Sequence, residues 1–490
     1  MNRTLFALCL ATLLSSISAF GQGAGEKLAA LRALKIEAGT ITKVERDTTG
    51  TRTIVKLTLN PAKGSNIQVE VWLPDAEKWN TRFLGLGNGG AAGKINPGGL
   101  NGASAQGYAV ATTDMGTAPN ALSGVGNPEV WKDFGYRATH LMTVVGKQIV
   151  RAHYGKAPEF SYFSGGSTGG QQALQEAQRY PEDYDGIAAA VAAHCRTPLH
   201  AYFLWNDQIL KKCPFTKSQD TNIMAAANEY MASREIPIAA GKFVSDPRCD
   251  AKDIEAVIAL ARKKDATLTD EHAAALRKLF DGPRHAVTGE RIFNGIPLGS
   301  SIEASHGHLY LFNWVFGADK NLQELNFGAD IDTYTAKLAP YLNANNPDLR
   351  AFEKRGGKLV MTLGTADSVV PYHACIDYYE RVTERFGGLE KVQSFFRFYV
   401  VPGLAHGGGP GINQAPNLLE TVRTWRETGT APFALTGRHV ENGKSKWEIP
   451  IYPYPTQTGW NATTSTFQPV EGKRGGVEPI ANRFLPAPVE

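Results

Sequence analysis

Polar and apolar positions alternate one by one over residues 38–75, most clearly in 51–59 and 67–73, with turn residues between the runs. This period of two predicts antiparallel strands at the start of a sheet. Two further apolar strands follow. One, at 82–90, runs into a glycine loop, and the other, at 107–114, ends in an Asp.

The next segments bring strands and helices in turn. A helical run at 134–154 precedes an apolar strand at 160–164, a helix that starts near Gln171 and a buried strand at 186–193. Strands that alternate with helices in this way predict a mostly parallel sheet covered by helices on both faces. The fold class expected is therefore α/β.

The alternation stops over residues 196–340. Helical stretches such as 270–280 mix there with irregular, aromatic-rich segments such as 309–316. The strand pattern returns at 358–364. A chain of 490 residues is too long for one small core, and an inserted lid domain explains the interruption.

The predicted organisation is therefore a catalytic domain made of residues 22–195 and 341–490, with a lid at 196–340. Three lid residues, Trp205, Phe312 and Trp314, are candidates for an aromatic pocket, although core packing is the commoner role for such side chains.

The first 21 residues have the composition of an export signal. Arg3 precedes an apolar core at 5–14, too short for a stable membrane span, and Ala19-Phe-Gly21 places small residues before Gln22. We expect cleavage after Gly21 and a secreted or periplasmic protein without a membrane anchor. A buried N-terminal helix is the alternative.

The mature chain keeps four cysteines: Cys195, Cys213, Cys249 and Cys375. An even number in an exported protein predicts disulfides, with three possible connectivities that the sequence leaves open. No Cys-x-x-Cys or His-x-x-x-His spacing is present, so the sequence predicts no metal site.

Charge and composition narrow the classes of partner. The net charge is +4, 20% of the residues are charged and 42% are apolar, and the sequence has no dense run of Lys or Arg. A nucleic acid partner is therefore not expected.

The strongest chemical signal is Gly165-Gly-Ser167-Thr-Gly169, which lies between a strand and a helix. Gly-x-Ser-x-Gly in this context is the nucleophile elbow of α/β-hydrolases, where a sharp turn exposes the serine and glycines avoid collision. The chain has 51 glycines, so a simple tight turn is the alternative.

The glycine loop after the earlier strand has two interpretations. Gly85, Gly87 and Gly90 satisfy Gly-x-Gly-x-x-Gly, and Asp114 ends a strand further on, as in a dinucleotide site. The helix that such a site needs is not expected, because residues 96–102 are full of helix breakers. In a hydrolase this loop donates an N–H to the oxyanion hole, so Gly89 or Gly90 is expected to act with the N–H of Thr168.

The other members of a catalytic triad follow late strands. Asp367 comes after the strand at 358–364, and His406 comes after the strand at 394–401. The order Ser167, Asp367, His406 is that of α/β-hydrolases and differs from the two main protease orders. A helix cap is the alternative role for Asp367 alone.

Several blocks make the chain resemble the tannase and feruloyl esterase family, which includes the esterase of the monoester from PET degradation. They span most of the chain outside the lid and stand in the family's order. The blocks are 79–84, Tyr136-Arg-Ala-Thr-His140, 164–172, Arg179-Tyr-Pro-Glu-Asp-Tyr-Asp-Gly186, 364–371, 401–406 and 452–455. The resemblance implies an α/β-hydrolase core, a large lid and a triad of Ser167, Asp367 and His406.

Two departures from the family pattern follow from the resemblance. Many members join cysteines beside the serine and the histidine, where this chain has Gly166 and Gly407, so packing is expected to hold the two loops. The calcium loop of the family would fall near 238–249, where Asp246 is the single carboxylate. Because Ca²⁺ takes six to eight oxygen ligands, we expect this site to be absent or weak.

Together these features predict hydrolysis of an ester of an aromatic or phenolic acid through an acyl-enzyme, without a cofactor. A lactonase or peptidase on the same fold is the first alternative, and a catalytically silent binding protein is the second. Lys94, Asp114 and His140 receive no role beyond structural support.

Overall fold

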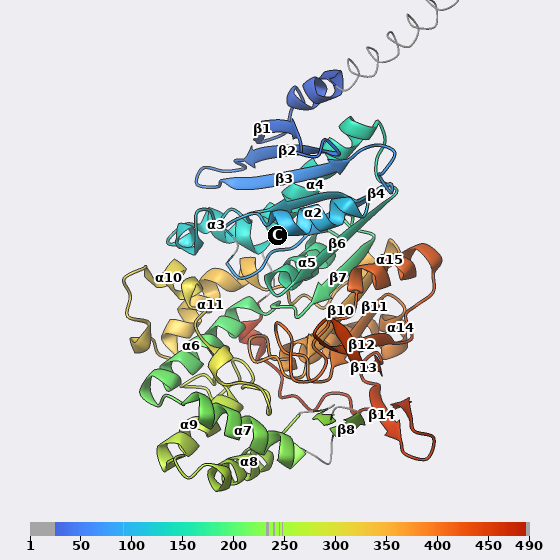
Figure 1. The fold of residues 1–490 in the computed structure, drawn as a ribbon. Coiled ribbons are helices and arrows are strands. Elements are labelled where there is room, and N and C mark those ends of the chain that lie inside the picture. The colour runs from blue at the N-terminus through green and yellow to red at the C-terminus, as the bar shows by residue number, and fades with distance from the viewer. Residues whose placement is uncertain are drawn as a thin grey trace, which may run out of the picture.

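The computed structural model describes residues 25–486 except 92, 232–234, 239–240, 245 and 247. The predicted signal peptide lies outside this range. Nine strands form one sheet in the order β1-β2-β3-β5-β4-β6-β7-β10-β11 (Figure 1). They are β1 (Gly39–Arg46), β2 (Arg52–Leu59), β3 (Ile67–Pro74), β5 (Ala109–Thr113), β4 (Arg82–Leu86), β6 (Phe160–Gly166), β7 (Gly186–Ala190), β10 (Lys358–Gly364) and β11 (Phe396–Val401).

The direction of each strand follows its sequence pattern. Strands β1, β2 and β3 pair antiparallel, and β3 pairs antiparallel with β5, as the alternating positions predict. In β3 the side chains of Ile67, Val69 and Val71 are buried on one face. From β5 to β11 each pair is parallel, and every residue of β5 is buried. The predicted mostly parallel sheet is confirmed.

Helices cover both faces of this sheet, as shown by two neighbouring residues of β4 that pack into different apolar clusters. Phe83 packs into the cluster that includes α4 (Ala138–Tyr154) and α5 (Thr168–Arg179). The next residue, Leu84, packs into the cluster that includes α2 (Pro97–Ala105) and α15 (Leu418–Thr428). The α/β-hydrolase architecture follows from this two-sided burial.

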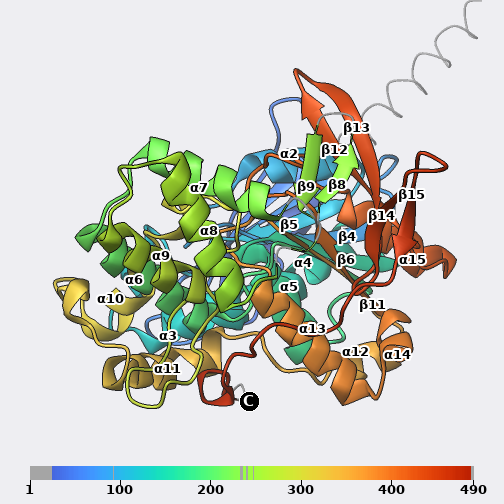
Figure 2. The same cartoon turned by 90° about the horizontal axis from the view of Figure 1, so that it is seen from below.

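The chain between β7 and β10 adds no strand to the large sheet in its described part. It contains α6 (Arg196–Lys212), α7 (Lys217–Tyr230), the hairpin β8 (Glu235–Ile238) and β9 (Gly241–Val244), α8 (Ala251–Lys264), α9 (Asp270–Asp281), α10 (Tyr310–Phe316), α11 (Ala329–Leu342) and α12 (Arg350–Lys354). Helices α6 to α11 form a helical body on one side of the sheet (Figures 1 and 2). The predicted lid limits, 196 and 340, fall at the start of α6 and within α11 and stay a prediction.

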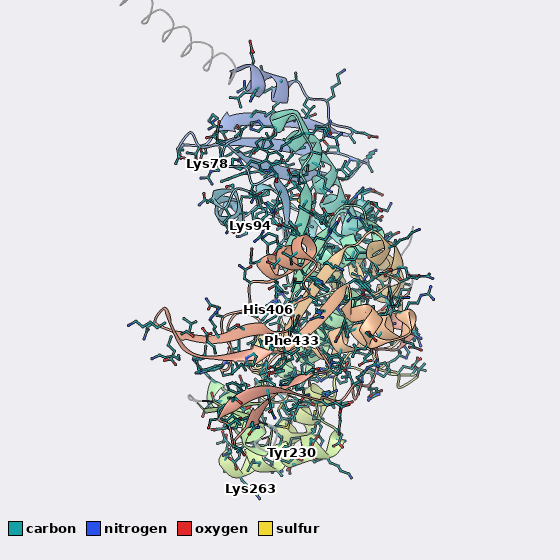
Figure 3. The ribbon with its side chains drawn as sticks, turned by 90° about the vertical axis from the view of Figure 1, so that its right-hand side faces the viewer. Lys78, Lys94, Tyr230, Lys263, His406 and Phe433 are labelled. Atoms are coloured by element: carbon teal, nitrogen blue, oxygen red, sulfur yellow. The ribbon has the colours of Figure 1, made fainter. Side chains whose placement is uncertain are left out.

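The remaining elements complete the core and its rim. They are α3 (Pro128–Lys132), α13 (His373–Phe386), α14 (Leu389–Gln393), and the hairpins β12 (Leu435–Glu441) with β13 (Lys444–Ile451) and β14 (Gln457–Asn461) with β15 (Thr466–Val470). Figure 3 shows His406 at mid-height, between Lys94 above and Tyr230 below. None of the described helices combines the length and the apolar character needed to cross a membrane.

Two local expectations were wrong. Residues 97–105 form helix α2 despite their breakers, because the Asn96 side chain caps it and Pro97 stands in the first turn, where its missing N–H costs nothing. Residues 310–316, expected to be irregular, form helix α10, in which Leu311, Phe312 and Trp314 are buried. The burial of Phe312 and Trp314 against the core stabilises α10.

The disulfide prediction was also wrong. Cys195, Cys213 and Cys375 are buried and carry free thiols, so none of these three forms a disulfide in the structure. Cys195 and Cys213 flank the 17-residue helix α6, which holds them about 25 Å apart. Cys195 and Cys375 instead approach the two ring nitrogens of His194, with their Sγ atoms at 3.1 and 3.7 Å.

Candidate active site

The nucleophile elbow joins β6 to α5 at Ser167. Its backbone has φ 58° and ψ −116°, a strained combination for a residue with a side chain. A Cβ at position 165 would lie 2.5 Å from the Gly169 carbonyl oxygen, so glycine is required there. The Ser167 N–H donates to the Ala190 carbonyl at 3.0 Å, which fixes the turn against β7.

The glycine loop after β4 packs directly against the elbow. A Cβ at Gly87 would lie 2.6 Å from the Gly169 Cα. Asn88 holds the loop: its N–H donates to Gln172 Oε1 at 2.8 Å, and its carbonyl accepts from the Gly169 N–H at 2.7 Å. This close packing explains the glycines without a nucleotide, and α2 starts too far beyond Gly90 to receive a pyrophosphate.

Gly90 and Thr168 come together as the oxyanion-hole prediction requires. Thr168 is the first residue of α5, so its N–H has no partner within the helix. Its Oγ1 donates to the Gly90 carbonyl at 2.6 Å. Both Gly89 and Gly90 are exposed, and only Gly90, with φ 57°, is among the residues that line the cavity beside Ser167.

Asp367 and His406 occupy loops that follow β10 and β11. Asp367 is fully buried, and its Oδ1 accepts from the N–H groups of Val369 and Val370 at 2.9 and 2.8 Å. Its Oδ2 lies 2.9 Å from His406 Nδ1. This bond holds the proton on Nδ1 and leaves the lone pair on Nε2.

Ser167, Thr168, Gly90 and His406 share one cavity of about 280 Å³. Among the contacts of the described residues, Ser167 Oγ makes no hydrogen bond to His406; such bonds often form fully only in the substrate complex. The other lining residues are Ala193, Arg196, Leu199, His200, Phe203, His308, Val369 and Val370. None of them is acidic.

The lid forms one wall of this cavity through α6. Leu199 and Phe203 supply apolar surface, and burial lowers the pKa of His200 well below its usual range. Burial and the nearby Arg196 also lower the pKa of His308. Of the three aromatic residues considered for a pocket, none lines the cavity: Phe312 and Trp314 are core residues, and Trp205 borders a separate cleft.

Arg196 is a site residue that the sequence analysis missed. It is 4% exposed, and its Nη2 donates to the Gly90 carbonyl at 3.1 Å and also bonds the Tyr310 hydroxyl. Its guanidinium lies over the Phe134 ring, 5.3 Å from the centroid. The sequence carried no signal for this role, because residue 196 reaches Gly90 through tertiary packing alone.

The three residues left without a role lie outside the cavity. Asp114 is buried and accepts hydrogen bonds from the N–H groups of Gln68 and Gly116 at 2.9 and 2.8 Å, so it ties the end of β5 to the start of β3. Lys94 is exposed. His140 lies beside Asp183, near the far end of α5 from Ser167.

Comparison with known proteins agrees with this geometry. The family profile described as tannase and feruloyl esterase matches residues 52–318 and 307–471. Feruloyl esterase B of Aspergillus niger is 30% identical over 433 residues, which cover 82% of this chain and 82% of that protein. An uncharacterised esterase of Xanthomonas campestris is 29% identical over 497 residues, covering 87% of this chain and 86% of that protein.

Two solved structures share the fold. Feruloyl esterase B from Aspergillus oryzae superposes with a TM-score of 0.78 at 21% identity, covering 91% of this chain and 100% of that one. Tannin acyl hydrolase from Aspergillus niger gives a TM-score of 0.73 at 17% identity, covering 93% and 96%. Since the family profile also spans most of the sequence, the chain belongs to the tannase and feruloyl esterase family of carboxylic ester hydrolases.

Proposed function

We propose that the protein hydrolyses esters of aromatic or phenolic acids through an acyl-enzyme on Ser167. The observation that carries this proposal is that Ser167 and His406 share one cavity with apolar lining, and that the buried Asp367 bonds His406 from behind. Leu199 and Phe203 of α6, with Val369 and Val370 after β10, form an apolar surface that suits a flat aromatic group.

In the proposed mechanism His406 Nε2 takes the hydroxyl proton of Ser167 as Oγ attacks the ester carbonyl. Asp367 keeps the imidazole in the required tautomer and stabilises the imidazolium. The N–H groups of Thr168 and Gly90 receive the developing oxyanion. His406 then protonates the leaving alcohol and activates the water that cleaves the acyl-enzyme.

The test compares methyl ferulate, methyl gallate and p-nitrophenyl acetate as substrates of the wild type and Ser167→Ala. Cleavage of an aromatic methyl ester, with a loss of at least about 10³-fold in the variant, supports the whole proposal. Activity on p-nitrophenyl acetate alone would retain the mechanism and refute the aromatic substrate. Equal rates in the two proteins would show that Ser167 is not the nucleophile.

The same purified protein distinguishes the alternative functions, which are a lactonase, a peptidase and a binding protein. A lactonase or a peptidase would prefer a lactone or a peptide to methyl ferulate in a parallel substrate panel. A binding protein that kept only the fold would turn over none of these compounds. We also propose export, for which N-terminal sequencing of the mature protein should begin at Gln22.

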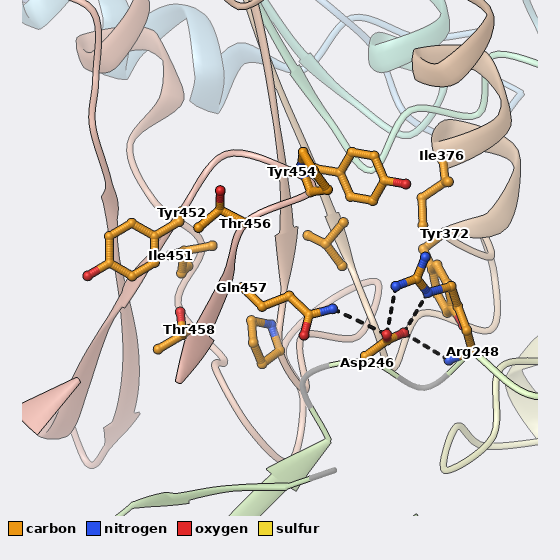
Figure 4. Close-up of a pocket in the computed structure, with 13 residues that line it drawn as sticks. Asp246, Arg248, Tyr372, Ile376, Ile451, Tyr452, Tyr454, Thr456, Gln457 and Thr458 are labelled. Carbon is orange, nitrogen blue, oxygen red and sulfur yellow. Dashed lines mark hydrogen bonds and ion pairs between the residues drawn. The ribbon is translucent and has the colours of Figure 1, made fainter. Parts of the chain in front are cut away.

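We further propose that the lid binds no calcium tightly. Figure 4 shows the Asp246 carboxylate facing the Arg248 guanidinium and the Gln457 amide. Arg248 Nε and Nη2 each lie 2.7 Å from a carboxylate oxygen, and Gln457 Nε2 lies 3.2 Å away. An arginine therefore neutralises this carboxylate, and melting curves in CaCl₂ and in EGTA should coincide.

A further inference from the structure

Two sequence blocks that the catalytic site does not use meet at one point of the fold. His140 lies in the first turn of α4, and Asp183 lies in the loop that leads into β7. They converge on Glu176, near the C-terminal end of α5. Nine residues of helix separate Glu176 from Ser167, which is about 13 Å.

The ligand-forming atoms of these three side chains are close together. His140 Nδ1 lies 2.7 Å from Asp183 Oδ2, and the three residues can offer one atom each within 4.8 Å of one another. The His140 ring stacks on Tyr180, with centroids 3.8 Å apart and planes 10° apart, so its orientation is fixed. The cluster is thus held in place from two sides.

Glu176 shows why this cluster differs from an ordinary ion pair. Its side chain is fully buried, and neither carboxyl oxygen receives a hydrogen bond from any donor of the described residues. Burial and the neighbouring Asp183 carboxylate raise the pKa of Glu176 well above its usual range. Lys147, the nearby cation, donates to the backbone carbonyl of Asp183.

Two buried carboxyl groups that face each other need a shared proton or a cation between them. An imidazole nitrogen and two carboxylate oxygens form a donor set of the kind that Zn²⁺ accepts. Calcium is a poorer match, because it takes six to eight oxygens. The side chains of His140 and Asp183 are 28% and 12% exposed, which gives an ion a route from solvent.

We propose that His140, Glu176 and Asp183 bind a divalent transition metal of the zinc type. Zinc bonds of about 2.0–2.1 Å at tetrahedral angles place donor atoms about 3.3 Å apart, so the His140–Asp183 pair opens by about 0.6 Å. Solvent completes the coordination. The metal ties α4 and α5 to the loop before β7, and its role is structural because it lies far from Ser167.

The experiment titrates CoCl₂ into EDTA-treated, full-length mature protein. The expected result is a visible d–d absorption that saturates at one equivalent, disappears on addition of ZnCl₂, and needs less cobalt at pH 8 than at pH 6. The pH effect follows because protons compete with the metal for the ligand atoms. ZnCl₂ should also raise the melting temperature of the wild type.

Glu176→Gln and His140→Gln should each abolish this absorption and retain esterase activity. Glutamine resembles a protonated Glu176, so the first variant should fold even without metal. His306→Gln is the matched control, since His306 is a partly exposed histidine 3.8 Å from the Asp207 carboxylate, and no third ligand completes a cluster with them among the described residues. It should bind cobalt like the wild type.

Absence of a saturable spectrum in the wild type would overturn the proposal and leave a shared proton between Glu176 and Asp183. Binding that survives in both Glu176→Gln and His140→Gln would place the metal elsewhere and overturn it equally. If Glu176→Gln fails to fold, His140→Gln decides the question, because His140 is partly exposed and a glutamine amide can still donate a hydrogen bond to Asp183.

Discussion

Replacement of Arg196 by methionine tests how the oxyanion loop is held. The Gly90 carbonyl accepts from Thr168 Oγ1 at 2.6 Å and from Arg196 Nη2 at 3.1 Å. No carboxylate of the described residues forms an ion pair with Arg196, so its removal leaves no buried acid without a partner. Methionine fills a similar volume, and we expect the variant to fold.

The size of the effect follows from the bond that is lost. A hydrogen bond from a charged donor contributes about 1.5–3 kcal/mol, while one oxyanion-hole donor contributes about 2.7–4 kcal/mol to catalysis. Because Thr168 still holds Gly90, the loss should lie near the lower values. A tenfold change in rate corresponds to about 1.4 kcal/mol, so kcat should fall about 10- to 100-fold.

The assay is steady-state hydrolysis of the best aromatic methyl ester over a wide concentration range. KM should stay within about threefold, since Arg196 acts on the loop that stabilises the transition state. Arg196→Lys should recover part of kcat, and Thr168→Ser, which keeps the hydroxyl, serves as the control. An unchanged kcat would refute this reasoning, and a rise in KM alone would show that Arg196 binds the substrate directly.

Three further predictions concern the same frame. Asp367→Asn should lower kcat by about 10³- to 10⁴-fold with a folded protein, because the amide favours the wrong His406 tautomer; a loss below tenfold would remove Asp367 from the triad. A Cβ at Gly166 would meet its nearest neighbour at 3.6 Å, and one at Gly407 would meet nothing within 4 Å, so both positions have room for a cysteine. The double variant Gly166→Cys/Gly407→Cys, once oxidised to a disulfide, should gain about 2–4 kcal/mol in free energy of unfolding. Identical melting of its oxidised and reduced forms would contradict this. Burial lowers the pKa of His194 to about 4. Below about pH 6.5 the unfolded chain therefore binds a proton that the folded chain excludes, and the free energy of unfolding falls by up to about 1.4 kcal/mol per pH unit. Urea titrations from pH 7 to 4 should show that this free energy falls less steeply with pH in His194→Gln than in the wild type.

The sequence was sufficient wherever local rules decide the structure. Period-two alternation predicted β2 and β3, because one face of each strand is buried. The glycines at 165 and 169 predicted the elbow: a Cβ at 165 would lie 2.5 Å from the Gly169 carbonyl oxygen, and one at 169 would make a tight 3.2 Å contact. The positions of Asp367 and His406 after apolar strands predicted two loops that the parallel sheet brings to one edge.

The sequence was insufficient where distant segments meet. Arg196, His200 and Phe203 reach the cavity because α6 packs across it, and no periodicity records that contact. The free thiols of Cys195 and Cys213 have the same cause: the count of cysteines is even, but α6 keeps these two far apart. Trp314 was a pocket candidate for which core packing was the commoner role, and its burial confirms the core, which composition alone does not distinguish from an aromatic wall.

The lid therefore does more than enclose the cavity. Arg196 begins α6 and Tyr310 begins α10, and the two side chains bond to each other beside the Gly90 carbonyl. The same insertion that supplies Leu199 and Phe203 to the cavity thus also holds the Gly90 loop through Arg196. Because one body performs both tasks, a change in the lid that alters substrate preference should alter kcat as well, and the two effects should separate only for residues that contact the cavity without contacting Arg196 or Tyr310.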